Sequence, residues 1–134
     1  MVHYQDKTAS LTPLQQRIII DKATEYPHSG VFNTVVSSGT YLCRRCGLAL
    51  FRGENQFSSG CGWPSFDEQI TNSIQQIPDK DGQRIEILCA RCSAHLGHVF
   101  QGEFLTNKNL RHCVNSASLD FVHDSRVLDT EEAV

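Results

Sequence analysis

Apolar residues follow a helical spacing in one early stretch of the chain. The segment 12–15, Thr-Pro-Leu-Gln, starts this stretch with a capping hydroxyl, a proline at the first helical position and a glutamine three residues after the cap. We expect a short helix that ends near Ala23 or Thr24, before a turn over residues 26–30. The apolar residues at helical spacing are Leu14, Ile18 and Ile19.

After Gly30 the pattern changes to short apolar or alternating runs separated by Gly, Ser, Asn and Asp, which is typical of antiparallel strands. One pair of runs predicts a hairpin around residues 78–82, with Ile85 and Ile87 on its inward face. The chain is therefore expected to be mainly β. The candidate strands are residues 31–36, 40–42, 73–77 and 84–88.

Composition narrows the class of protein. At 134 residues and 40% hydrophobic content, the chain suits a single domain over residues 1–134, with a core at about 11–122 and a flexible tail at 123–134. We also expect a monomer. A net charge of −3 argues against nucleic acid as a partner. No apolar run approaches the roughly 18 residues of a membrane span.

The cellular compartment is predicted from the first residues. They hold no basic start followed by an apolar stretch, so we expect no secretory signal and a cytoplasmic protein. In a reducing cytoplasm, clustered cysteines more often bind metal or carry out redox chemistry than form static disulfides.

Four of the six cysteines form two C-x2-C pairs, separated by 42 residues. Each pair offers two thiolates from a tight turn, and two such turns complete a tetrahedral sulfur site suited to Zn²⁺. Four sulfurs leave no open position for a substrate, so we expect a structural metal that contributes about 10 kcal/mol to folding. The predicted ligands are Cys43, Cys46, Cys89 and Cys92.

Two other interpretations of these cysteines remain. A thioredoxin-like C-x-x-C motif is disfavoured because neither pair sits in a βαβ pattern. A local ligand set that combined Cys89 and Cys92 with His95 and His98 would leave the first pair without a role.

Cys113 is a cysteine outside these pairs. If its segment is extended, the period of two puts Arg111, Cys113 and Asn115 on one face, with a cation and an amide beside the sulfur. Positive charge nearby would favour the reactive thiolate. His112 and Val114 would then face the other way. A small buried hydrophobe is the alternative for Cys113.

Cys61 lies between two glycines, next to the single tryptophan, Trp63. A thiol in such a turn can be exposed and mobile enough for disulfide exchange. The alternative makes Trp63 a core residue and Cys61 a small filler.

Two histidines, His95 and His98, flank Gly97 directly after the second cysteine pair. On a regular strand they would face opposite sides of the sheet. A bulge at Gly97 would turn both toward one site. The alternative is that each is a structural histidine with satisfied hydrogen bonds.

Taken together, segments 60–66, 95–100 and 111–118 and the two cysteine pairs resemble the B-type methionine sulfoxide reductases. These enzymes are specific for the R epimer of methionine sulfoxide, as one enzyme acts on each epimer. The resemblance runs from about Leu11 to Phe121. It implies a fold of two antiparallel β-sheets with a zinc clamp, and a role in protein repair after oxidative stress.

The resemblance also implies roles for individual residues. Cys113 corresponds to the catalytic nucleophile, Cys61 to the resolving cysteine and Trp63 to the ring that receives the substrate methyl group. The residues that correspond to polar groups around the sulfoxide are His95, His98, Arg111 and Asn115. The four paired cysteines correspond to the zinc ligands. The chain departs from the family pattern at His28, at His112 and over residues 101–109.

The expected mechanism begins with attack of the Cys113 thiolate on the sulfoxide sulfur, while His98, or next His95, donates a proton to the oxygen. The resulting Cys113 sulfenic acid condenses with Cys61 to a disulfide, which thioredoxin reduces. Two other classes remain. One is a zinc-stabilised β module that binds a protein partner without catalysis. The other is a cysteine hydrolase.

Overall fold

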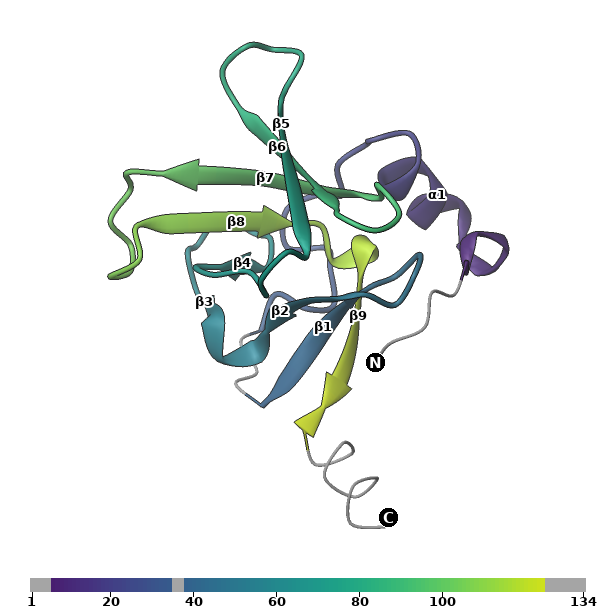
Figure 1. Cartoon of the computed structure of the whole chain (residues 1–134), viewed down its shortest axis with the longest axis horizontal. Coiled ribbons are helices and arrows are strands. Elements are labelled where there is room, and N and C mark those ends of the chain that lie inside the picture. The colour runs from purple at the N-terminus through teal and green to yellow at the C-terminus, as the bar shows by residue number, and fades with distance from the viewer. Residues whose placement is uncertain (1–5, 35–37, 125–134) are drawn as a thin grey trace.

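The structure is a computed structural model that describes residues 6–34 and 38–124. Two antiparallel sheets make up most of it (Figure 1). The smaller sheet has the order β2-β1-β9, with β1 at Gly39–Cys43, β2 at Ala49–Arg52 and β9 at Leu119–His123. The larger sheet has the order β3-β4-β8-β7-β6-β5. Its strands are β3 (Gln56–Phe57), β4 (Ser65–Phe66), β5 (Ile74–Pro78), β6 (Ile85–Cys89), β7 (His95–Gln101) and β8 (Leu110–Val114). The expected fold is confirmed.

Helix α1, Pro13–Ile19, begins with the predicted capping box, because Thr12 and Gln15 exchange side-chain and backbone hydrogen bonds. It ends at Ile19 and not near residue 23, so the predicted end was wrong. Lys22 has a φ of 63°, a left-handed conformation that stops the helix. Three short 3₁₀ helices are η1 (Thr8–Ser10), η2 (Gly53–Asn55) and η3 (Ser116–Ser118).

The turn expected at residues 26–30 is confirmed by the Ser29 N–H, which donates to the Tyr26 carbonyl oxygen at 3.1 Å. The strand expected at residues 31–36 is wrong for 31–34, while 35 and 36 lie outside the described residues. Side chains satisfy this backbone in place of a neighbouring strand. The Phe32 N–H donates to Ser116 Oγ, and the Phe32 carbonyl oxygen accepts from Gln56.

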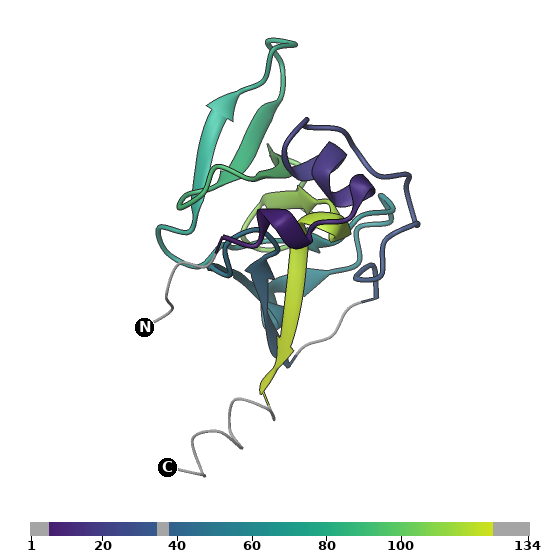
Figure 2. The same cartoon turned by 90° about the vertical axis from the view of Figure 1, so that its right-hand side faces the viewer.

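The predicted hairpin is formed by β5 and β6, and its tip extends away from the two sheets (Figures 1 and 2). Ile87 is fully buried, as expected, but Ile85 is 42% exposed. The inward orientation of Ile85 was wrong because this residue pairs with Pro78 near the projecting tip, beyond the core.

The core lies between the two sheets. The Tyr41 ring of β1 packs on the Phe66 ring of β4, with centroids 5.0 Å apart, and the Phe51 ring of β2 stacks on Phe66 at 4.4 Å. These rings are all buried, so aromatic contacts fix the position of β4, next to β8.

The single-domain prediction stays a prediction. From residue 125 onward, the predicted tail lies outside the described residues, and His123 ends β9. Within the described ranges, α1 is far too short to cross a membrane, and no other helix is long and apolar enough to do so.

Candidate functional site

Cys113 lies in β8, near the middle of the larger sheet. Its partners on the neighbouring strands are Ser65 of β4 and His98 of β7. Strand alternation leaves Cys113 partly exposed and buries His112, whose ring packs 5.6 Å from the Phe51 ring. The predicted facing of these two side chains is confirmed, and Cys113 is not enclosed in the core.

Cys61 approaches Cys113 from a turn between β3 and β4. Gly60 and Gly62 have φ values of 78° and 93°, which a glycine adopts without strain. The two sulfur atoms lie 3.8 Å apart. A disulfide requires about 2.05 Å. A small movement of the glycine-flanked turn is enough to join them.

A cavity of about 180 Å³ opens beside the two thiols. It brings together six of the seven residues proposed for catalysis and substrate binding: Cys61, Trp63, His98, Arg111, Cys113 and Asn115. His95 is the exception. Thr24, Arg84 and Phe100 also line the cavity and were not predicted.

The two histidines lie on the same side of β7, with ring centroids 5.9 Å apart. The β6–β7 register shifts between Ile87 and Leu88, so of the two geometries that the sequence left open, an irregularity next to Gly97 occurs and regular alternation does not. Only His98 reaches the thiol cavity. His95 lines a neighbouring cavity of about 400 Å³ that His98 also borders.

Each histidine is held by a carboxylate. His98 Nε2 lies 2.6 Å from Asp79 Oδ2, and His95 Nδ1 lies 2.7 Å from Glu86 Oε2. Glu86 also receives a hydrogen bond from Lys22 at 3.1 Å. Burial lowers the pKa of His95, although Glu86 opposes this effect. A histidine that a carboxylate orients and that borders a reactive thiol is suited to proton transfer, and His98 has both properties.

The two thiols differ in acidity. Burial raises the pKa of Cys61, but hydrogen bonds with Ser59 and Ser65 outweigh it and bring this pKa to about 7. Burial, followed by the charge of Cys61, raises the pKa of Cys113 to about 12. Arg111 lowers the Cys113 pKa, as expected, but does not overcome burial. In the reduced site, Cys61 is therefore the more acidic of the two thiols.

Arg111 is fixed at the edge of the cavity. Its guanidinium lies 4.3 Å from the centre of the Phe100 ring, and its Nε donates to Glu103 at 2.7 Å. The cation is therefore partly neutralised and stacked on an aromatic face.

Glu25 connects the segment after α1 to both sides of the site. Its carboxylate accepts the N–H groups of Ser116 and Ala117, each at 3.0 Å, just after the Cys113 strand. Its backbone oxygen accepts the Trp63 indole N–H at 3.1 Å, and its N–H donates to Asn115 Oδ1 at 3.0 Å. Asn115 is 3% exposed and therefore orders the backbone around the site.

The two cysteine pairs converge at one end of the fold. Their four Sγ atoms lie within 4.8 Å of one another, with the Cys43–Cys92 and Cys46–Cys89 pairs at 3.5 and 3.6 Å. Sulfur atoms around a tetrahedral Zn²⁺ lie about 3.8 Å apart, given a Zn–S bond of about 2.3 Å. The four cysteines are therefore positioned to bind a metal ion. No group with histidine ligands occurs among the described residues.

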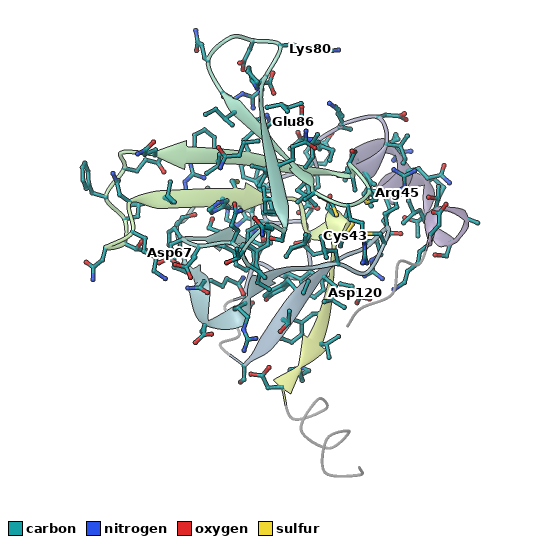
Figure 3. The ribbon with its side chains drawn as sticks, viewed as in Figure 1. Cys43, Arg45, Asp67, Lys80, Glu86 and Asp120 are labelled. Carbon is teal, nitrogen blue, oxygen red and sulfur yellow. The ribbon has the colours of Figure 1, made fainter. Side chains whose placement is uncertain are left out.

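The arginines inside the pairs brace the two turns against each other. Arg45 donates to the Cys92 carbonyl oxygen at 3.2 Å, and Arg91 donates to the Cys46 carbonyl oxygen at 2.8 Å. Cys43 and Arg45 are seen at the same end of the molecule as α1 (Figure 3). Each guanidinium thus brings positive charge to the other pair.

The departures from the family pattern lie in different places. His112 is buried and its Nδ1 contacts the Phe66 carbonyl oxygen at 3.0 Å, on the core side of β8. The His28 N–H donates to the Gly62 carbonyl oxygen at 2.6 Å and so supports the Trp63 turn. Segment 101–109 supplies Glu103, the partner of Arg111.

The fold and the site together define a β protein with four cysteines positioned to bind a metal ion and a separate pair of thiols that lie 3.8 Å apart. The SelR domain matches residues 11–123. The chain belongs to the SelR domain family, and the family resemblance inferred from the motifs is confirmed.

Relatives of known name agree with this assignment. Peptide methionine sulfoxide reductase B2, chloroplastic, of Arabidopsis thaliana is 50% identical over 90% of this chain, which spans 60% of that relative's length. Peptide methionine sulfoxide reductase B5 of Oryza sativa subsp. japonica is 49% identical over 84% of each chain. Among solved structures, the Mis18 'Yippee-like' domain aligns over 64% of this chain and 96% of its own length, with a TM-score of 0.49 and 14% identity.

Proposed function

We propose that this protein reduces methionine R-sulfoxide in peptides and proteins to methionine. The observation that carries the proposal is the pair of thiols 3.8 Å apart beside a cavity that an indole ring and a histidine also line. Membership of the SelR family and the names of the relatives support the same substrate.

The cavity suits the two ends of a methyl sulfoxide group. Trp63 offers an apolar face for the methyl group, and its indole N–H is already bonded to Glu25. The sulfoxide oxygen is then directed toward His98, which Asp79 orients. This arrangement separates the methyl group from the oxygen, which is the basis for choosing one epimer.

In the first step the Cys113 sulfur attacks the sulfoxide sulfur, the oxygen passes from the substrate sulfur to the Cys113 sulfur, the bond between the two sulfur atoms breaks and methionine leaves. Cys113 is oxidised to a sulfenic acid. The Cys113 thiol proton ends on the sulfenic oxygen, so the net step consumes no proton. We assign its transfer to His98, the residue opposite Cys113 on β7, with His95 behind it as the second candidate. Arg111 favours the thiolate as it forms, and Asn115 holds the backbone beside it.

In the second step Cys61 attacks the sulfenic sulfur, a Cys61–Cys113 disulfide forms and water leaves. A thioredoxin-type dithiol then reduces this disulfide and is itself oxidised. The short distance between the two sulfur atoms supports the pairing.

We further propose that the four-cysteine cluster holds one structural Zn²⁺ per chain. The sulfur spacings fit a closed tetrahedral site, and the cluster is separate from the thiol cavity. When bound, the ion supplies a cross-link between the β1–β2 turn and the β6–β7 turn. We propose a monomer as the working form.

The test is product formation from the separate R and S epimers of a methionine sulfoxide peptide, with dithiothreitol as reductant. Methionine from the R epimer alone supports the proposal. No turnover of either epimer by folded, zinc-loaded protein would favour a protein-binding module that does no chemistry.

A further inference from the structure

Two serine hydroxyls surround the Cys61 sulfur. Ser59 Oγ donates a hydrogen bond to Cys61 Sγ at 3.0 Å, and Ser65 Oγ lies 3.4 Å from the same sulfur. The two hydroxyl oxygens are 2.8 Å apart. The sulfur atom therefore contacts both members of a hydrogen-bonded serine pair.

The direction of these hydrogen bonds follows from the number of donors. Ser59 has one hydroxyl hydrogen, and it is directed at the sulfur, so Ser65 is the donor between the two serines. Ser65 Oγ also donates to the Trp63 carbonyl oxygen at 3.2 Å, so its one hydrogen is shared between that oxygen and Ser59; the same carbonyl oxygen lies 3.5 Å from Cys61 Sγ. A chain from Ser65 through Ser59 to Cys61 presents positive hydrogen density to the sulfur, and this stabilises a thiolate more than a thiol.

The hydrogen-bonded series from Ser65 through Ser59 to Cys61 is also connected to Cys113. Ser65 is 1% exposed and is the residue opposite Cys113 in the β4–β8 pair. The strand that carries Cys113 therefore also fixes the serine pair, and with it the position of Cys61. The acidity of Cys61, with a pKa of about 7, agrees with this placement.

We propose that Ser59, supported by Ser65, activates Cys61 for disulfide closure by holding it as a thiolate. This inference rests on the proposed function, since closure follows formation of the Cys113 sulfenic acid. The Cys61 thiolate attacks the sulfenic sulfur, the S–S bond forms and the S–O bond breaks. The departing hydroxide takes a proton from solvent and leaves as water. Only the thiolate fraction of Cys61 reacts, so the hydroxyl pair sets the rate of closure near neutral pH.

The hydroxyl of Ser59 also accepts the Cys61 backbone N–H at 3.4 Å, so a purely structural role in the turn has to be separated from activation. A structural role changes the amount of folded protein and the Cys61–Cys113 distance. An activating role changes the pH at which Cys61 reacts.

The experiment compares Ser59→Ala with Ser59→Thr, which keeps the hydroxyl, and with Ser58→Ala, an exposed neighbour as the matched control. The first readout is the pH dependence of Cys61 alkylation by iodoacetamide in the reduced full chain, followed by peptide mass spectrometry. For Ser59→Ala we expect the midpoint to rise by about one pH unit, which lowers the thiolate fraction at pH 7 about fivefold and slows alkylation there. The threonine variant and the control keep the wild-type midpoint. An unchanged midpoint in folded Ser59→Ala would overturn the proposal.

The second readout is a single turnover with methionine R-sulfoxide and no reductant. Ser59→Ala should release methionine at the wild-type rate and form the Cys61–Cys113 disulfide more slowly at pH 7, by up to about fivefold, because its thiolate fraction is smaller. Equal rates of disulfide formation in Ser59→Ala and the wild type would overturn the role of Ser59 and leave the proposed function standing. Absence of methionine from the wild type would instead refute the proposed function, and the alkylation midpoint would still decide whether Ser59 activates Cys61.

Discussion

Gly97 of β7 and Cys113 of β8 approach so closely that a Cβ atom on Gly97 would lie 1.9 Å from the Cys113 carbonyl oxygen. The same Cβ would lie 3.2 Å from Val114 Cα. Real atoms do not tolerate the first distance, so only glycine allows β7 to pair with β8 at this point. The strand pair that positions His98 opposite Cys113 therefore depends on the missing side chain.

Gly97→Ala should destabilise the protein by about 3 kcal/mol, since a rigid backbone atom must move to admit the methyl group. Urea denaturation measures the loss. Gly82→Ala is the matched control, because its φ of 73° carries backbone strain of about 1 kcal/mol, but nothing lies within 4 Å of the added Cβ. Equal losses for the two variants would show that the strands can separate freely.

Cys46→Ser should remove the metal and most of the folding stability, because this buried sulfur is one of four in the cluster. Metal content by elemental analysis and the thermal unfolding midpoint are the measurements. Cys61→Ser is the control, since it loses a thiol outside the cluster and should keep one Zn²⁺ per chain. A Cys46→Ser protein that melts at the wild-type temperature would refute the zinc assignment.

Cys61→Ser and Cys113→Ser should have different kinetic defects. Without Cys113 there is no nucleophile, so even a single turnover is lost. Without Cys61 the first turnover remains and thioredoxin-driven recycling stops, while dithiothreitol, a small dithiol, still supports most of the activity. Steady-state rates with each reductant distinguish the two. Turnover by Cys113→Ser at the wild-type rate would show that Cys113 is not the nucleophile.

Glu25→Gln should disturb Trp63 and the segment after Cys113 together. The amide has one acceptor oxygen, so one of the two N–H groups at Ser116 and Ala117 loses its partner, at a cost of about 1–3 kcal/mol. Fluorescence of the single tryptophan reports directly on this change. We expect an altered emission maximum and a lower kcat. Glu54→Gln, at an exposed carboxylate, should alter neither. Unchanged emission in Glu25→Gln would refute the connection that Glu25 makes between Trp63 and the segment after Cys113.

His112 should make the protein less stable in mild acid. Burial lowers the pKa of this histidine in the folded state, so below about pH 6.5 the unfolded chain binds a proton that the folded chain does not. Stability from this residue is complete above about pH 6.5 and is lost as the pH falls from there to the lowered pKa of the folded state. His112→Phe keeps a ring against Phe51 and should make the free energy of unfolding depend less steeply on pH in this range. Parallel slopes for variant and wild type would contradict the assignment.

The features that the sequence predicted correctly depend on local chemistry. The cap at Thr12 and the two C-x2-C pairs can be predicted from the sequence, because the residues of each motif act within a few positions of one another. The alternation of exposed and buried side chains around Cys113 can be predicted for the same reason, since strand geometry alone sets it.

The features that the sequence did not predict depend on partners far along the chain. Asp79 and Glu86 orient the two histidines from the β5–β6 hairpin, and no spacing rule connects these elements. The Phe32 region was wrongly predicted as a strand because its backbone partners are the side chains of Gln56 and Ser116. The acidity of Cys61 depends on a turn whose exact geometry only the folded chain defines.

The most direct test is to mix reduced protein with excess methionine R-sulfoxide peptide without a reductant, count the methionine formed per chain and map the resulting disulfide by mass spectrometry. We expect about one methionine per chain, a Cys61–Cys113 disulfide, four cysteines still bound to metal, and no product from the S epimer. Methionine formed without this disulfide, or no methionine from folded protein, would contradict the account.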